Sequence, residues 1–221
     1  MTASPQTTDQ LIEAVVMRSE QEFGKDAFVR AKDEFHTLFG KVFPEDPFFE
    51  SRMSYFLDHF VLLRPLPGQG PATPFLRFAP ALIDDPERGG KLIEAMESFR
   101  HSVFEILTVS PEDGMTIRDL RTGDGYNVRR KHNESFRGFT VGALFQGFVF
   151  PDGDSAWLGN GLIVHPPQVA QIIRKYLKSL IKSVDFDEQA MLARLAWVQL
   201  KAVRHSHAGA KRIYGTEIGN F

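Results

Sequence analysis

The chain contains no cysteine among its 221 residues. This absence excludes disulfide bonds, thiol catalysis, and zinc or iron–sulfur sites that need cysteine ligands. It fits a reducing compartment, so we expect a cytoplasmic protein. Long apolar runs are also missing, because Phe60–Leu63 and Gly161–Val164 are far too short to cross a bilayer. The segment Met1–Gln10 is polar and has neither the basic nor the apolar region of a signal peptide. We therefore expect no membrane span.

Sequence motifs that mark several large enzyme classes are absent as well. The chain has no G-x-S-x-G elbow, no G-x-x-x-x-G-K-S/T phosphate loop, no strand–helix G-x-G-x-x-G and no H-E-x-x-H. Its seven histidines are dispersed, and His205 and His207 have no acidic residue nearby. We expect neither a metal site nor a cofactor. Only His101, Glu105 and Asp119 offer acid–base chemistry in the central part of the chain, which leaves an enzyme with an unrecognised site as one hypothesis.

What the chain does contain is phenylalanine, with 20 residues of this type. So many rings predict a core built on large side chains, although an exposed patch for a partner would also use them. The net charge of −2 is divided unevenly, with a balance of −6 in residues 1–99 and +4 in residues 100–221. Ordinary scatter, complementary surfaces packed within one fold, and an anion-binding second half all explain this division. An excess of four positive charges is too weak to argue for duplex DNA, so we do not expect nucleic acid as the partner.

Apolar residues at helical spacing fill the first part of the chain. Gly24 and Gly40 end the first two predicted helices, and Arg64–Gly68 ends the third. Thr73-Pro74 and Asp85-Pro86 each combine an N-cap residue with a proline at the first helical position, so they begin two more. Residues 1–100 are therefore predicted to form the helical part.

The pattern changes in residues 101–165. Segments rich in β-branched and aromatic residues alternate there with turns that contain glycine and aspartate. The predicted strands are Val103–Val109, Met115–Leu120, Tyr126–Arg130, Phe139–Phe150 and Ala156–Val164. Because Phe139–Phe150 is apolar on both faces, helices or a barrel interior must cover both. The sequence predicts a small five-stranded antiparallel barrel or curled sheet.

Residues 166–204 are predicted to form two C-terminal helices. Val169–Ile181 carries the cleanest amphipathic stripe of the chain, and Asp185 with Glu188 resembles a capping box that begins the last helix. Residues 205–221 have no periodicity and are predicted to be a tail. Since strands are grouped rather than alternating with helices, the expected fold is a single α+β domain over residues 1–221. The oligomeric state is not defined by these patterns.

Two basic segments are candidate binding sites. The first is the loop between the third and fourth predicted strands, whose candidate ligand-binding residues are Arg129, Arg130, Asn133, Ser135 and Arg137. Guanidinium groups suit a phosphate or nucleotide ligand, whereas a solvated loop that protects a sheet edge is the alternative. The second is the polar face of the amphipathic helix, a candidate surface for a protein partner made by Arg174, Lys175, Lys178 and Lys182.

The loop also resembles part of a known domain. Asn133–Gly138 fits D/N-x-S-x-x-G, the second signature of PilZ domains, which precedes a strand. This resemblance covers the motif alone. It implies a small β-barrel that binds the bacterial second messenger cyclic di-GMP, with Arg129 and Arg130 on phosphates and Asn133 and Ser135 on base or phosphate edges. PilZ domains also carry an upstream R-x-x-x-R motif, which this chain lacks.

A longer segment, Ser102–Gly161, is similar to an uncharacterised bacterial α+β module that is sometimes joined to SEC-C zinc tails. The similarity is carried by Phe104-Glu105 in the first strand, Asp119–Gly123 at a turn, and Val128 before the basic loop. It implies a bacterial protein with a short barrel entered from a helical half. The chain has no cysteine-containing tail and so lacks a SEC-C metal site. The resemblance implies no function.

The sequence leaves three classes of function open. The first is a non-enzymatic regulatory or protein-interaction protein of the bacterial cytoplasm, because no catalytic constellation is recognisable. The second is a regulator that binds a cyclic dinucleotide or another phosphate ligand through Arg129–Gly138. The third is an enzyme with an unrecognised site.

Overall fold

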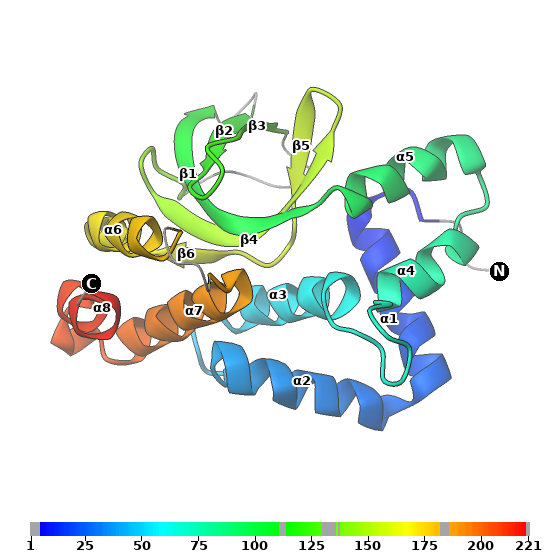
Figure 1. Cartoon of the computed structure of the whole chain (residues 1–221), viewed down its shortest axis with the longest axis horizontal. Coiled ribbons are helices and arrows are strands. Elements are labelled where there is room, and N and C mark those ends of the chain that lie inside the picture. The colour runs from blue at the N-terminus through cyan, green and yellow to red at the C-terminus, as the bar shows by residue number, and fades with distance from the viewer. Residues whose placement is uncertain (1–4, 111–113, 130–135, 137, 182–185, 220–221) are drawn as a thin grey trace.

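The computed structural model describes residues 5–110, 114–129, 136, 138–181 and 186–219. Within them, helices precede and follow a central block of strands (Figure 1). The α-helices are α1 (Thr8–Phe23), α2 (Lys25–Phe39), α3 (Phe49–Leu62), α4 (Pro74–Phe78), α5 (Pro86–Glu97), α6 (Ala170–Leu180), α7 (Glu188–Arg204) and α8 (Ala210–Ile218). Short 3-10 turns are η1 (Ala79–Leu82), η2 (Pro167–Val169) and η3 (Ser206–Ala208).

The strands form a closed five-stranded barrel with one additional strand. They are β1 (Arg100–Ser110), β2 (Gly114–Asp119), β3 (Gly125–Val128), β4 (Leu144–Asp152), β5 (Ser155–Leu158) and β6 (Ile163–His165). The order is β1-β2-β3-β5-β4, and a β1–β4 pairing closes the barrel. The predicted α+β fold is confirmed. The barrel is mixed rather than antiparallel, because β3 and β5 pair in parallel at Val128 and Ala156.

Alternation along the strands divides side chains between the barrel interior and the helices. Phe104 of β1 and Phe145 of β4 are cross-strand partners inside the barrel, with ring centroids 5.5 Å apart. On the other face of β4, Phe148 and Phe150 pack against the aromatic core of the N-terminal helices. β4 is thus covered on both faces, as its apolar sequence predicts.

Two predicted strands have different bounds in the structure. The one predicted at Phe139–Phe150 begins only at Leu144, because Gly138 and Gly142 adopt φ of 91° and 81° in the preceding turns. The one predicted at Ala156–Val164 is divided into β5 and β6. Gly161 lies in this interruption, where an added Cβ would sit 2.0 Å from the backbone nitrogen of Tyr55. The close approach of α3 therefore requires glycine there.

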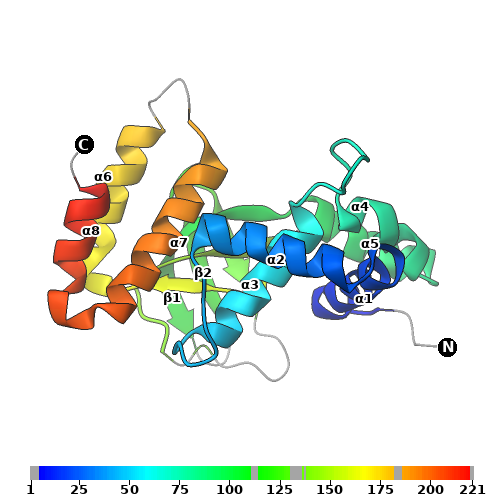
Figure 2. The same cartoon turned by 90° about the horizontal axis from the view of Figure 1, so that it is seen from below.

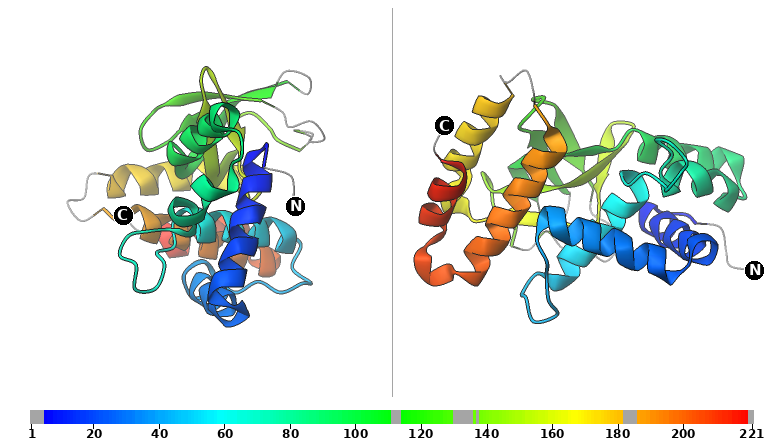
Figure 3. Two further views of the ribbon diagram at one scale, coloured as in Figure 1. Left: turned by 90° about the vertical axis from the view of Figure 1, so that its right-hand side faces the viewer. Right: turned by 60° about the horizontal axis from the view of Figure 1, so that its bottom comes forward.

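The helices form a layer beneath the barrel and two flanking groups. α2, α3 and α7 lie below the strands, whereas α1, α4 and α5 gather near the N-terminus (Figures 1 and 2). α6 and α8 lie at the opposite end, near the C-terminus (Figure 3). Thr73 caps α4 by accepting from the Leu76 amide at 3.4 Å, as predicted. None of the described helices is both long and apolar enough to cross a membrane.

The predicted C-terminal tail is wrong. Residues 210–218 form α8, which buries Ile213, Tyr214 and Ile218 in the core shared with α6 and α7. Only these few positions are apolar, so the sequence has no recognisable stripe, and the helix depends on tertiary packing. The predicted capping residue Asp185 lies outside the described residues. α7 begins instead after Asp187, whose carboxylate accepts from the Ala190 amide at 3.0 Å.

Candidate functional site

The candidate site is a groove between α6 and the β2–β3 turn. It has a volume of about 440 Å³. We call it the α6 groove, and it is lined by Arg118, Asp119, Leu120, Gly123, Arg174, Leu177, Lys178 and Ile181. It brings together two residues of the predicted basic helix face and a carboxylate of the predicted acid–base group.

The amphipathic sequence of α6 explains its orientation. Ile173 and Leu177 are buried in the core shared with α7 and α8. Lys175 and Lys178 are exposed on the opposite face, and Lys178 reaches the groove. Arg174 lies at the boundary between the two faces, with its side chain 29% exposed. The helix therefore presents cations along one wall of the groove.

Glu105 of β1 holds two of the groove's cations in place. Its carboxylate accepts from Arg118 Nη2 and from Arg174 Nη2, both at 2.6 Å. Arg118 is its cross-strand neighbour on β2, so strand register and helix packing together build this cluster. Burial alone would raise the pKa of Glu105, but the two hydrogen-bonded guanidinium groups outweigh it and hold the pKa below its ordinary value.

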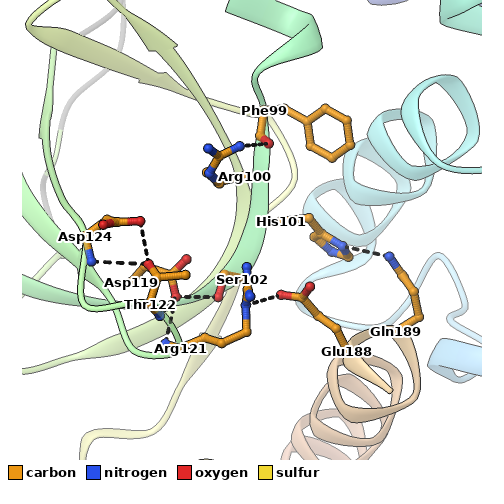
Figure 4. Close-up of polar contacts among 10 residues, drawn as sticks. All are labelled: Phe99, Arg100, His101, Ser102, Asp119, Arg121, Thr122, Asp124, Glu188 and Gln189. Carbon is orange, nitrogen blue, oxygen red and sulfur yellow. Dashed lines mark hydrogen bonds and ion pairs between the residues drawn. The ribbon is translucent and has the colours of Figure 1, made fainter. Parts of the chain in front are cut away.

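Asp119 shapes the turn that forms the other wall (Figure 4). Its Oδ1 accepts from Ser102 Oγ at 2.7 Å, from the Arg121 amide at 2.8 Å and from the Thr122 amide at 3.4 Å. This is the arrangement by which aspartate replaces a backbone acceptor in a turn. Gly123 completes the turn with φ of 85°. Asp119 is fully buried, and its Oδ2 has no hydrogen-bond partner.

An ion pair ties this turn to the start of α7. Arg121 Nε lies 2.8 Å from Glu188 Oε1 (Figure 4). Partial burial raises the pKa of Glu188 despite the nearby guanidinium. The β2–β3 turn is thus anchored both to β1 and to a C-terminal helix, which fixes one wall of the groove.

His101, Glu105 and Asp119 do not meet as an acid–base group. Asp119 of β2 is the cross-strand partner of Phe104 on β1, so its side chain lies on the barrel-interior face together with that of Ser102. His101 and Glu105 lie on the opposite face, about 13 Å apart along the strand. Their side chains also have separate partners. The predicted constellation is therefore not assembled.

His101 belongs instead to a buried polar chain between the barrel and the helices. Its Nε2 lies 2.5 Å from Tyr55 Oη, and its ring stacks on Phe148 at 4.2 Å. Gln146 Nε2 contacts the same Tyr55 hydroxyl at 3.2 Å, and the Gln189 amide lies 3.5 Å from His101 Nδ1. Burial holds the pKa of His101 well below its ordinary value, so the ring is neutral. These contacts join α3, β1, β4 and α7.

The predicted ligand loop is only partly described. Arg129 is exposed at the end of β3, where its amide donates to the Ala156 carbonyl at 3.0 Å. The remaining candidates, Arg130, Asn133, Ser135 and Arg137, lie outside the described residues. Binding of a phosphate or cyclic dinucleotide by this loop therefore stays a prediction.

Of the predicted interaction surface, Arg174 and Lys178 line the groove, Lys175 is exposed beside it, and Lys182 lies outside the described residues. The sequence interpretation missed Arg118, which joins the groove through β-sheet register. It also assigned Ile181 to the buried stripe, whereas its side chain is 41% exposed. Ile181 is the last apolar residue of this stripe, where packing against neighbouring helices stops, and its position was the one sequence feature that could have indicated its exposure.

Among the described residues, no three histidine, aspartate or glutamate side chains lie close enough together to hold a metal ion. Comparisons with protein-family models, with curated proteins and with solved structures found no match. Functional arguments for this chain therefore rest on its own geometry.

Proposed function

We propose that this chain is a non-enzymatic regulatory protein of the bacterial cytoplasm that binds a protein partner through the α6 groove. The observation that carries the proposal is the combination of apolar and cationic side chains in one groove. Ile181 and the partly exposed Leu120 supply apolar surface, while Arg118, Arg174 and Lys178 supply positive charge. A short partner segment with both acidic and large apolar side chains has the complementary chemistry.

The placement of the charges favours an acidic partner. The Glu105 side chain is 12% exposed and Asp119 is buried, whereas the Arg118 side chain is 49% exposed. A partner that approaches from solvent therefore meets the cations first. A guanidinium has five N–H donors, and each contact with Glu105 uses one of them. The same arginines, already oriented by Glu105, can donate to a partner carboxylate.

The apolar part favours a protein segment over a free inorganic anion. Ile181 is among the large apolar side chains left exposed, and it lies beside the cations rather than alone. Covering it would contribute about 1 kcal/mol to binding. A phosphate ion would satisfy the guanidinium groups but would leave this surface in water.

Selection from a random peptide library displayed on phage tests the proposal even though the partner is unidentified. The purified chain is expected to enrich peptides that combine Asp or Glu with Leu, Ile or Phe. Binding of a selected peptide, measured by fluorescence anisotropy, should weaken as salt rises, because exposed charges are screened.

The matched variants are Lys178→Glu in the groove and Lys211→Glu on α8, both at exposed positions. Charge reversal at Lys178 should lower the affinity for the selected peptide at least about tenfold. Reversal at Lys211 should leave that affinity within about twofold of the unmodified chain. Enrichment of peptides without acidic residues, or equal losses in the two variants, would contradict the proposal. Circular dichroism confirms that both variants are folded.

A further inference from the structure

Arg52 of α3 is a buried cation that has no anionic partner among the residues the structure describes. It is 2% exposed. Its Nη2 donates to the Ala196 carbonyl at 2.7 Å and to Gln199 Oε1 at 2.6 Å, both on α7. Its Nη1 is enclosed and has no hydrogen-bond acceptor. None of the ion pairs found among the described residues includes it.

The surroundings of Arg52 do not compensate its charge. Burial lowers the pKa of Arg52 to about 10, which still leaves the guanidinium protonated at neutral pH. Asp46 attracts this charge from a distance, but its carboxylate already accepts from Arg204 at 2.6 Å and 3.1 Å. Burial, with a smaller effect of Arg52, lowers the pKa of His165 to about 3, so that ring is neutral. Buried charges in proteins are normally paired, because desolvation without a counter-charge is costly.

A cavity of about 240 Å³ lies beside this cation. Arg52 and the amide of Gln199 contribute to its wall, and Ser51 adds a hydroxyl. The Ser51 hydroxyl is fixed by its neighbour, because its Oγ donates to the Leu162 carbonyl at 2.5 Å and accepts from the Leu162 amide at 3.1 Å. Apart from Asn160, the remaining described residues of the wall are apolar, and they include Phe139 and Val164.

We propose that this cavity binds a small organic monocarboxylate, with its carboxylate on Arg52 Nη1 and its apolar body against Phe139 and Val164. The carboxylate supplies both the missing acceptor and the missing negative charge. Because Nη1 is enclosed, the wall must shift to admit it. Phe48 and Val164, which are 46% and 40% exposed, are the wall residues with room to move. This site is independent of the α6 groove.

The chemistry of the cavity selects a monocarboxylate over phosphate. Arg52 is the one cationic side chain among the described residues of the wall, so a phosphate dianion would bring a second, uncompensated negative charge into a buried region. The apolar part of the wall gains only from a ligand with hydrocarbon surface. A volume of about 240 Å³ suits an acid with a single ring or a short alkyl chain.

Thermal unfolding in the presence of benzoate and hexanoate tests the proposal, with benzamide, hexanamide and inorganic phosphate as comparison ligands at constant ionic strength. At about 10 mM, at least one carboxylate should raise the melting temperature by about 2 °C or more in a saturable way, and its neutral amide by less than about 0.5 °C. Equal shifts of the melting temperature with a carboxylate and its amide would contradict the proposed site. So would the absence of a shift with either carboxylate.

Two variants locate the binding. Arg52→Met removes the charge with little change of shape, and Val164→Phe fills the cavity at a partly exposed position while keeping Arg52. Each should lower the affinity for the carboxylate ligand at least about tenfold. Arg212→Met, on the exposed face of α8, should leave that affinity unchanged. If Arg52→Met fails to fold, Val164→Phe still decides the question. Unchanged carboxylate binding in the folded Val164→Phe variant would contradict the assignment.

Discussion

Arg52 and the pair Arg118 and Arg174 place the same functional group in two opposite environments. Arg52 is enclosed between α3 and α7 with only neutral acceptors. Arg118 and Arg174 share the carboxylate of Glu105 at the edge of the barrel, and their side chains are 49% and 29% exposed. Substitutions on the buried side should therefore act mainly on folding stability, and those on the exposed side mainly on binding.

The largest expected effect comes from Gly161→Ala, on the segment that walls the Arg52 cavity. A Cβ there would lie 2.0 Å from the Tyr55 nitrogen and 2.1 Å from its Cα. Backbone atoms cannot rotate away, so α3 must move, at a cost of about 3 kcal/mol in the free energy of unfolding. Urea denaturation measures it. Gly215→Ala on α8, which meets nothing within 4 Å, is the control and should stabilise by about 0.5 kcal/mol.

Acid should destabilise the buried region before it affects the exposed ion pairs. Burial lowers the pKa of His59 to about 4 and of His165 to about 3, and holds that of His101 well below its ordinary value. Below about pH 6.5 the unfolded chain binds protons at these histidines and the folded chain does not, so stability present at pH 7 is lost as the pH falls. Each contributes a slope of about 1.4 kcal/mol per pH unit.

Urea unfolding at pH 7, 6 and 5 measures this slope. His165→Asn retains a polar atom toward the Tyr214 hydroxyl, which His165 Nδ1 contacts at 2.8 Å, and should reduce the slope by about 1.4 kcal/mol per pH unit. A free energy of unfolding that does not change between pH 7 and pH 5 would show that these rings are not buried in the neutral form.

The next prediction compares two variants of Arg52, one that removes both its volume and its charge and one that removes mainly its charge. Arg52→Ala leaves a void and deprives the Ala196 carbonyl and Gln199 of their donor, which should cost about 2–3 kcal/mol. Arg52→Met fills most of the space and removes the uncompensated charge, so it should change the free energy of unfolding by less than about 1 kcal/mol. Equal losses in the two variants would mean that the charge itself stabilises the fold.

The smallest effect on stability is expected at Glu105. Glu105→Gln should cost less than about 1 kcal/mol, because ion pairs of partly exposed groups contribute little. Its lowered pKa makes this contribution constant above the unfolded value of 4.5. Affinity for an acidic peptide should rise about threefold, since the groove loses a negative charge. Glu34→Gln, which breaks the exposed pair with Arg64, should leave peptide affinity unchanged.

The strand-rich centre of the fold could be predicted from local sequence, because its turns need glycine and aspartate at particular positions. Three local patterns failed, one of them Ala156–Val164, which is divided into β5 and β6. Phe139–Phe150 has apolar alternation from its first residue, yet Gly138 and Gly142 place its beginning in turns. α8 has too few apolar positions to be recognised, and it forms because Tyr214 and its neighbours find a core to enter.

The α6 groove could be predicted only in part. The basic face of α6 is visible in the sequence, but its partners come from β1 and β2. Arg118 and Arg174 lie 13 and 69 residues from Glu105, so their meeting depends on strand register and on how α6 docks. The burial of Arg52 could not be predicted from the sequence, because a single arginine in an amphipathic helix is normally expected on the surface.

Site-specific photo-crosslinking in cells that naturally make this protein tests the central claim most directly. A benzophenone side chain at Ile181, in the groove, is compared with one at Val29 of α2, an exposed position outside the α6 groove. The α6 groove predicts a discrete protein adduct from position 181 that disappears with Lys178→Glu and persists with Lys211→Glu, and no such adduct from position 29. No discrete adduct from position 181, or one that survives Lys178→Glu unchanged, would contradict the proposed binding function.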